Sequence, residues 1–290
     1  MKSISVFFLL LFNAVVFSQN NCLHFDGSND NIAIPHNPAI DFSINDSFTL
    51  ETWFKTSNTS SQYLMIYSKM ANTFPFRGYE MYLTYGKLTF VAISDLATNN
   101  AVKIESMSAY NDNNWHHAAC VYNGSPNPAN MQMYIDGVLQ PYTVVSNNLT
   151  GPFNSTITAY LGGRQGANYS YGGLLDDFKI WNRGLCGSEI NFRKNCNTPG
   201  NANGLVALYN FDHGVAGGNN STVNNLTNLS LSGGLTGTLS GFALTGSTSN
   251  WLISTTSVSS TCTSFASTHP QVRPVLPISP LRRWLQRSSA

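Results

Sequence analysis

Charged side chains are scarce in this sequence. Aspartate, glutamate, lysine and arginine make up 10% of its 290 residues, and the formal net charge is +1. Nucleic-acid binding depends on clustered lysine and arginine side chains that neutralise phosphates. Basic residues gather only at Arg282, Arg283 and Arg287, where a solvated tail is the simpler interpretation. The composition therefore gives no reason to expect a nucleic-acid partner.

Apart from one short stretch at the start, the sequence also has no long apolar run. Lys2, the apolar residues 6–12 and the small side chain of Ser18 follow the pattern of a secretory signal peptide that is cut before Gln19. The apolar stretch is too short to cross the roughly 30 Å hydrocarbon core of a membrane. We therefore expect residues 1–18 to be a removed signal peptide. The mature chain is expected to be secreted or displayed at the cell surface without spanning the membrane.

Cysteine is sparse, and its spacing does not match the common zinc motifs. The five cysteines are Cys22, Cys120, Cys186, Cys196 and Cys262. Export favours disulfides, while an odd number leaves at least one thiol unpaired. Cys186 and Cys196 flank the best candidate for a helix, residues 188–195, with Ser188 as its cap. We expect these two cysteines to form a disulfide and Cys120, in an apolar strand, to be a buried free thiol.

Short segments with period-two alternation dominate the rest of the sequence. Alternating side chains point to opposite faces of a strand. The segments Tyr85-Gly86 and Asp136-Gly137 each follow such a strand and favour tight hairpins. The expected strands are residues 48–54, 79–83, 87–93, 115–122, 131–135, 138–139, 160–162 and 174–181. Their spacing predicts an all-β fold of two packed antiparallel sheets.

The composition of the sequence changes after Cys196, which suggests a domain boundary there. We expect a sandwich over residues 19–197 and a β-rich extension over residues 198–255. The extension is rich in glycine, asparagine, serine and threonine and is too small to form a sandwich alone. Residues 256–290 are expected to be a linker and a disordered tail, because four prolines break up the last part of the chain.

Five segments in this order are similar to a known family. They are Leu-His-Phe-Asp-Gly-Ser-Asn-Asp at residues 23–30, Phe-Thr-Leu-Glu-Thr-Trp-Phe at 48–54, Trp-His-His-Ala-Ala at 115–119, Met-Tyr-Ile-Asp-Gly at 133–137 and Gly-Leu-Leu-Asp-Asp-Phe-Lys-Ile-Trp-Asn-Arg at 173–183. Together they resemble the laminin-G-like jelly roll of exported bacterial proteins, within the concanavalin A-like lectin/glucanase superfamily. The resemblance implies one concave and one convex sheet. It also implies a module that binds glycans, proteins or lipids, often with calcium.

Catalytic carboxylates do not follow the pattern that a glycosidase needs. Acid and nucleophile must flank one bond, so on this fold two or three carboxylates alternate along a strand. The glutamates Glu51, Glu80, Glu105 and Glu189 are isolated. Asp176 and Asp177 are adjacent, so on a regular strand they point to opposite faces. Neither a Gly-x-Ser-x-Gly elbow nor a phosphate loop is present. We therefore expect no catalysis.

Four aspartates are candidates for a calcium site. Asp26 and Asp30 lie in the turn after the first strand, and Asp176 and Asp177 open the last sandwich strand. Calcium takes about six to eight oxygen ligands, often from carboxylates and backbone carbonyls. First and last strands of a jelly roll are often neighbours, so the four carboxylates are candidates to converge on a calcium ion. The alternative is that Asp26 and Asp30 cap a turn and Asp176 accepts backbone hydrogen bonds.

A sugar site needs aromatic rings on which the sugar stacks and planar polar partners for its hydroxyls. The candidates are Tyr79, Tyr82, Tyr85, Arg164, Asn168, Tyr169 and Tyr171. The alternative for each tyrosine is packing of the sandwich.

These patterns predict an exported, non-catalytic recognition module that binds a glycan or an extracellular protein. Two alternatives stay open: a carbohydrate-active hydrolase or lyase on the same fold, and a structural surface protein without a small ligand. The oligomeric state is left open as well.

Overall fold

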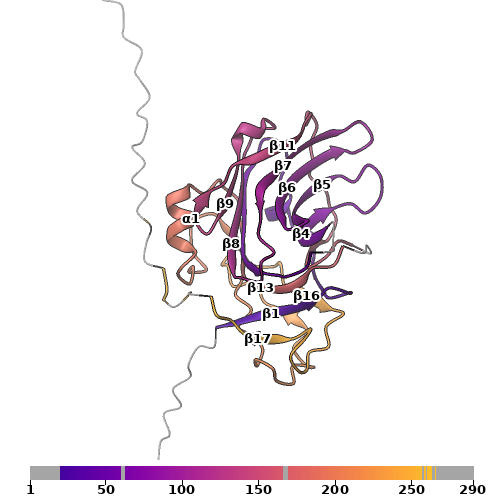
Figure 1. Ribbon diagram of the computed structural model, residues 1–290. Coiled ribbons are helices and arrows are strands. Elements are labelled where there is room, and N and C mark those ends of the chain that lie inside the picture. Colours follow the sequence, from indigo (N-terminus) through magenta and orange to yellow (C-terminus); the bar gives the residue numbers. More distant parts are fainter. Residues whose placement is uncertain are drawn as a thin grey trace, which may run out of the picture.

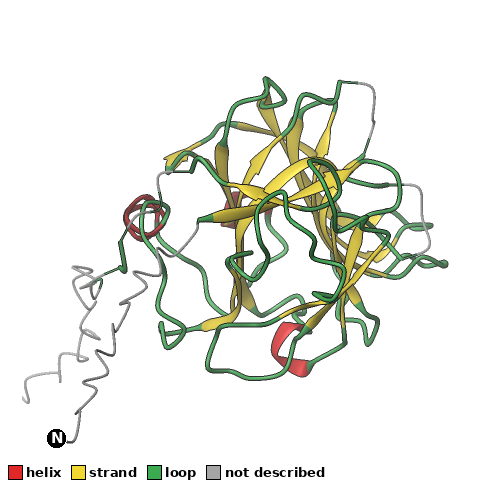
Figure 2. Ribbon diagram, turned by 90° about the horizontal axis from the view of Figure 1, so that it is seen from below, coloured by secondary structure: helices red, strands yellow, loops and turns green. Residues whose placement is uncertain are grey.

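The computed structural model of the chain describes residues 20–59, 63–165, 169–256, 258, 260–262 and 265. The predicted signal peptide and nearly all of the predicted disordered tail lie outside these residues. Strands and loops make up almost all of the described chain (Figure 2). Within this part of the chain, no helix has the length and the apolar character that crossing a membrane requires.

Two antiparallel sheets form the molecule, which confirms the predicted all-β sandwich. The strands of sheet A are β1 (Asn21–Asp26), β3 (Ser47–Lys55), β8 (His116–Asn123), β9 (Met131–Ile135), β10 (Val138–Leu139), β13 (Gly172–Trp181), β14 (Leu205–Tyr209) and β17 (Trp251–Ile253). The strands of sheet B are β2 (Asn31–Ile34), β4 (Leu64–Met70), β5 (Gly78–Thr84), β6 (Lys87–Asp95), β7 (Asn100–Ala109), β11 (Tyr142–Asn147), β12 (Ala159–Leu161), β15 (Asn225–Leu226) and β16 (Gly237–Ser240).

The spatial order of the strands is that of a jelly roll. Sheet A runs β10-β9-β8-β3-β13-β1-β17, and β14 also pairs with β13. Sheet B runs β11-β7-β6-β5-β4-β12-β2-β16-β15. Neighbours in space are therefore often far apart in sequence, and the two sheets alternate along the chain (Figure 1).

Alternation along each strand builds the core between the sheets. On β5, Tyr79 and Met81 point inward and are at most 1% exposed. The ring of Phe48 on β3 lies 4.9 Å from that of Tyr79, so aromatic rings join the two sheets. Full burial of each such side chain contributes about 1.5–3 kcal/mol.

Both predicted hairpins form where the sequence places glycine. Asp136 and Gly137 adopt φ values of 54° and 81°, and Tyr85 and Gly86 adopt 48° and 82°. Two consecutive positive φ angles are the signature of the type I′ turn, whose twist suits a two-residue hairpin. Asp136-Gly137 therefore acts as a turn, as predicted.

Residues 198–255 contribute strands to both sheets. β14 pairs with the second half of β13, and β17 pairs with β1, so both belong to sheet A. β16 pairs with β2 and brings β15 into sheet B. Leu226, Leu235 and Trp251 are buried in the common core. The extension is thus packed as part of the sandwich.

One helix, α1 (Gly187–Arg193), covers the outer face of sheet A (Figure 1). Ile190 of the helix packs with Trp181 of β13 and Val121 of β8, which point away from the central core. The helix lies close to the predicted position, but its N-cap is Cys186 and not Ser188.

The predicted disulfide between Cys186 and Cys196 is wrong. Cys196 is bonded to Cys262, while Cys186 is a free thiol. The reason is the helix between the two predicted partners. Its seven residues rise about 1.5 Å each, which separates its ends by more than the ~7 Å that a disulfide spans between Cα atoms. Cys262 instead reaches Cys196 because its backbone N–H donates to the carbonyl of Asn197 over 2.8 Å.

Replacing Cys262 with serine should lower the free energy of unfolding by roughly 2–4 kcal/mol, because the disulfide closes a long loop of the unfolded chain. The two cysteines are 66 residues apart. Denaturant unfolding measures the loss, and Cys186→Ser is the matched control, with little expected change. Peptide mapping without reduction that finds Cys186 joined to Cys196 would contradict the assignment.

Candidate functional site

The outer face of sheet B is largely apolar, although it points away from the core. Met65 and Met70 on β4, Tyr82 on β5, and Val91 and Ile93 on β6 are all at most 8% exposed. Apolar side chains on an outer sheet face are hidden from water only when other segments cover them. Here the cover comes from loops.

These strands and loops enclose a groove with a volume of about 350 Å³. Its floor includes Glu80, Tyr82, Val91, Ile93 and Lys103, and its rim includes Tyr63, Phe76, Arg164 and Tyr169. We call this set of residues the groove. Its volume falls in the range of small-molecule sites, which are mostly apolar with a few placed polar groups.

An ion pair organises the floor of the groove. The carboxylate of Glu80 is 1% exposed, and both of its oxygens accept from Arg164, with Nε to Oε1 at 2.6 Å. Ser68 on the neighbouring strand β4 donates a further hydrogen bond to Oε1 over 2.7 Å. Such a two-point contact fixes the plane of the guanidinium as well as its position.

Aromatic rings continue from this ion pair across the rim. The guanidinium carbon of Arg164 lies 5.0 Å from the ring centre of Tyr169. The ring of Tyr169 meets that of Tyr63 edge-on at 5.2 Å, and Tyr63 lies 5.5 Å from Tyr82. Edge-on and tilted pairs are the favoured ring geometries. The rim is therefore a connected set of rings and not a collection of separate tyrosines.

Lys103 on β7 brings a second cation to the floor. Its ammonium lies 5.6 Å from the ring centre of Tyr82. Burial lowers the pKa of Lys103, while the carboxylates of Glu105 and Glu80 act in the opposite direction.

The predicted sugar-binding residues divide between the groove and other places. Tyr82, Arg164 and Tyr169 come together in the groove. Tyr85 sits in the β5–β6 turn, 60% exposed and outside the groove. Asn168 lies outside the described residues.

Tyr171 does not belong to the groove, which corrects the prediction. It is fully buried in the core, 5.9 Å from the ring of Phe25, and its hydroxyl lies within donating distance of the backbone carbonyl of Lys55. It directly precedes β13, so the start of that strand turns its side chain inward. Tyr79 is likewise a core residue.

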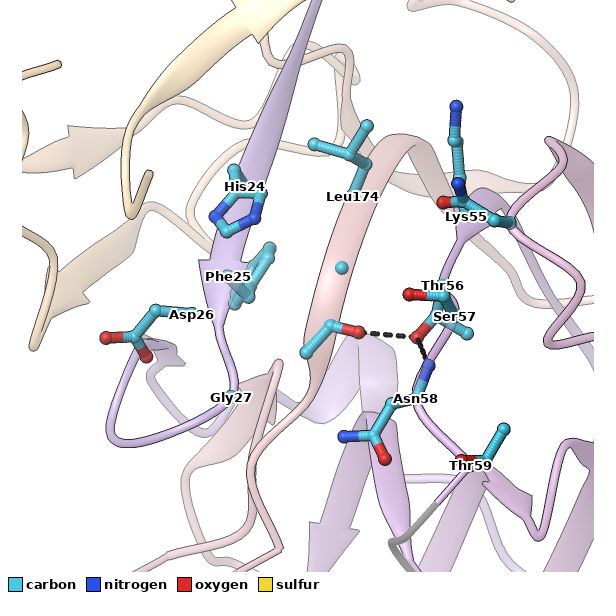
Figure 3. A pocket seen from close by; sticks show the side chains of 13 residues that line it. His24, Phe25, Asp26, Gly27, Lys55, Thr56, Ser57, Asn58, Thr59 and Leu174 are labelled. Carbon is cyan, nitrogen blue, oxygen red and sulfur yellow. Dashed lines mark hydrogen bonds between the residues drawn. The ribbon is translucent and has the colours of Figure 1, made fainter. Parts of the chain in front are cut away.

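A second, more open hollow of about 590 Å³ lies where β1 and β3 end and β13 begins (Figure 3). His24, Leu174 and Lys55 form a row across these three strands, because His24 pairs with Leu174 and Leu174 pairs with Lys55. Thr56 donates to the carbonyl of Gly172 over 2.6 Å and closes one wall. We call this the polar hollow. Of the described residues that line it, Phe25 alone has a hydrocarbon ring, and that ring is buried in the core.

The four predicted calcium ligands do not converge. Asp26 pairs with Gly172, four residues before Asp176, which places the two aspartates about 13 Å apart along the strands. The carboxylate of Asp30 accepts from the backbone of Asp26 and from Ser249, both over 2.8 Å. In the described part of the chain, no three His, Cys, Asp or Glu side chains gather in a way that could hold a metal ion. Calcium binding itself stays a prediction.

Asp176 and Asp177 also differ from the prediction that they face opposite ways. The register of β13 against β3 shifts between Asp176 and Lys179, and Asp177 has a φ of 51°. Leu175 and Phe178, on either side, both point into the core. The extra residue is a β-bulge, which leaves both aspartates on the outer face of sheet A.

The bulged aspartates lie beneath a chain segment and not in a cavity. Asp176 accepts hydrogen bonds from Ser254 over 2.6 Å and from Thr256 over 3.0 Å. Burial, followed by the charge of Asp177, raises the pKa of Asp176 well above its ordinary value.

We predict that Asp176→Asn changes how stability depends on pH. The folded state of the natural chain holds the Asp176 proton more tightly than the unfolded state, so its stability falls as pH rises from about 4 toward the raised pKa. Asparagine does not titrate, and its amide oxygen still accepts from Ser254 and Thr256. Urea unfolding at pH 4.5 and pH 8 should therefore find a gain for Asp176→Asn that grows with pH. A difference that stays constant with pH would contradict the assignment.

Sequence reasoning missed Glu80 and Lys103 as groove residues. Both look like ordinary polar positions of a strand that faces water. Neighbouring residues did carry a signal for the groove. Tyr82 makes β5 apolar on both faces, and Val91 does the same for β6. A strand with two apolar faces indicates that the outer face is covered.

Comparisons with known proteins agree with this architecture. A family model described as the concanavalin A-like lectin/glucanases superfamily matches residues 26–191, more than half of the chain. A candidate carbohydrate binding protein from Bacteroides ovatus ATCC 8483 aligns with a TM-score of 0.55 at 15% identity, over 78% of this chain. Domains LG4-5 of the mouse laminin alpha1 chain align with a TM-score of 0.42 at 18% identity, over 58% of this chain and 44% of theirs.

The chain spans 59% of the Bacteroides ovatus protein. At this level of identity the likeness concerns the fold. No curated protein matches the sequence.

Proposed function

The chain belongs to the concanavalin A-like lectin/glucanases superfamily, and from this premise we propose that it is an exported, non-catalytic recognition module that binds a glycan in the groove of sheet B. Recognition of an extracellular protein through the same face is the broader form of this proposal.

The observation that carries the proposal is the chemistry of the groove. Apolar faces of sugars stack on aromatic rings, and sugar hydroxyls need fixed donors and acceptors beside them. The half-buried rim rings of Tyr63 and Tyr169 supply the first element, with Tyr82 packed against Tyr63, and the fixed guanidinium of Arg164 supplies the second. The polar hollow offers polar groups without an accessible hydrocarbon ring, so it fits a sugar less well.

The number of carboxylates that line the groove supports binding over hydrolysis. Glycoside hydrolysis needs two carboxyl groups about 5–10 Å apart across the scissile bond. Among the described residues that line the groove, Glu80 is the only carboxylate, and both of its oxygens are held by Arg164.

Export is supported by the disulfide between Cys196 and Cys262, because disulfides persist in oxidising compartments. We keep calcium-assisted binding in the proposal because the sequence predicts it. A thermal melt with calcium and with a chelator tests it, since an ion bound to the folded state raises the melting temperature.

Tyr169→Ala should weaken glycan binding roughly tenfold, because it removes the ring that spans the rim between Arg164 and Tyr63. Tyr169→Phe keeps the ring and should retain most of the affinity. Calorimetric titration with the best glycans from an array measures both variants.

Tyr85→Ala is the matched control, because Tyr85 is exposed and lies outside the groove. Equal losses for Tyr85→Ala and Tyr169→Ala, or a natural chain that binds no glycan on the array, would argue against the groove as a glycan site.

A further inference from the structure

The charges that line the groove do not cancel. Among the described residues that line it, three are charged, namely Glu80, Lys103 and Arg164. Glu80 and Arg164 neutralise each other through their two-point contact. Lys103 is therefore the charge that remains.

The side-chain ammonium of Lys103 makes no hydrogen bond or ion pair with any described residue. It lies 5.6 Å from the ring centre of Tyr82. The two carboxylates whose charges reach it, Glu105 and Glu80, have other cationic partners. Glu105 is 3.5 Å from the ammonium of Lys87, and Glu80 is held by Arg164.

A half-buried ammonium without an anion has lost part of its hydration and gained no partner in return. An anionic group in the groove would supply a charge-assisted hydrogen bond, which is stronger than a neutral one. A lysine ammonium acts as a compact point charge with three donors, so it accepts a carboxylate or a sulfate alike.

From this unmatched cation beside a tyrosine ring we infer that the groove selects glycans whose rings bear an anionic group, a carboxylate or a sulfate. The inference rests on the proposed glycan-binding function and deepens it. The sugar ring packs on the half-buried rim rings of Tyr63 and Tyr169, and the anionic substituent lies against Lys103. Asn99 and Ser146 line the groove as well and offer polar groups for the sugar hydroxyls.

The test compares acidic oligosaccharides with their neutral forms. Oligomers of galacturonate, mannuronate and glucuronate are each titrated beside the same oligomer after reduction of its carboxyl groups. A sulfated oligosaccharide and its desulfated form are the second arm, which separates the two sources of negative charge. At least one acidic form should bind the full-length mature chain about tenfold more tightly than its neutral partner.

Lys103→Gln should lower the ratio of acidic to neutral affinity from about ten to about one, whatever its effect on the binding of the neutral form itself. Lys55→Gln is the matched control, because it removes the same charge from the polar hollow on the other sheet. Thermal melts establish that both variants are folded.

The possible failures are distinguishable. Equal binding of acidic and neutral forms, or loss of the preference in Lys55→Gln as much as in Lys103→Gln, would overturn the inference and leave the proposed function in place. Binding of neither acidic nor neutral glycans would overturn both.

Discussion

The groove depends on the ion pair between Glu80 and Arg164. Glu80 projects from the middle of β5 and is almost fully buried, where a carboxylate without a partner would be strongly destabilising. Arg164 follows β12, which lies beyond β4 from β5, so the pair ties a loop to the floor strand two positions away. Because the same guanidinium lies over Tyr169, the ion pair also positions the aromatic rim. One polar contact thus links the sheet, the loop and the rings.

The outer faces of the two sheets are covered differently. On sheet A, α1 packs on Trp181, the segment after β17 binds Asp176, and the disulfide joins this segment to the end of the helix. The polar hollow that stays open on this sheet has no accessible hydrocarbon ring. On sheet B, loops cover the edges of the apolar patch and leave the groove between them, with the half-buried rings of Tyr63 and Tyr169 at its rim. This difference favours sheet B as the location of the proposed site.

The eight expected strands, the hairpins and the family could be predicted because their signals are local, whereas β4 and β7 were not predicted. Period-two alternation and the Asp136-Gly137 turn act within a few residues. The disulfide could not, since Cys262 reaches Cys196 only after the extension has joined both sheets. The bulge at Asp177 could not be predicted either. It lies between the part of β13 that pairs with β1 and the part that pairs with β14. Residue type selected Tyr82, Arg164 and Tyr169, which line the groove. It failed for Tyr171, whose direction is set by the start of β13, and it overlooked Lys103, whose importance comes from the charges around it.

Mapping of chemical shifts on the isotope-labelled protein, during titration with an acidic oligosaccharide, tests the location of the site most directly. If the glycan binds in the groove of sheet B, the perturbed amides belong to β4, β5, β6 and β7 and to residues near Arg164 and Tyr169. Perturbations confined to the ends of β1, β3 and β13, around His24 and Lys55, would contradict it and would assign recognition to the polar hollow on sheet A.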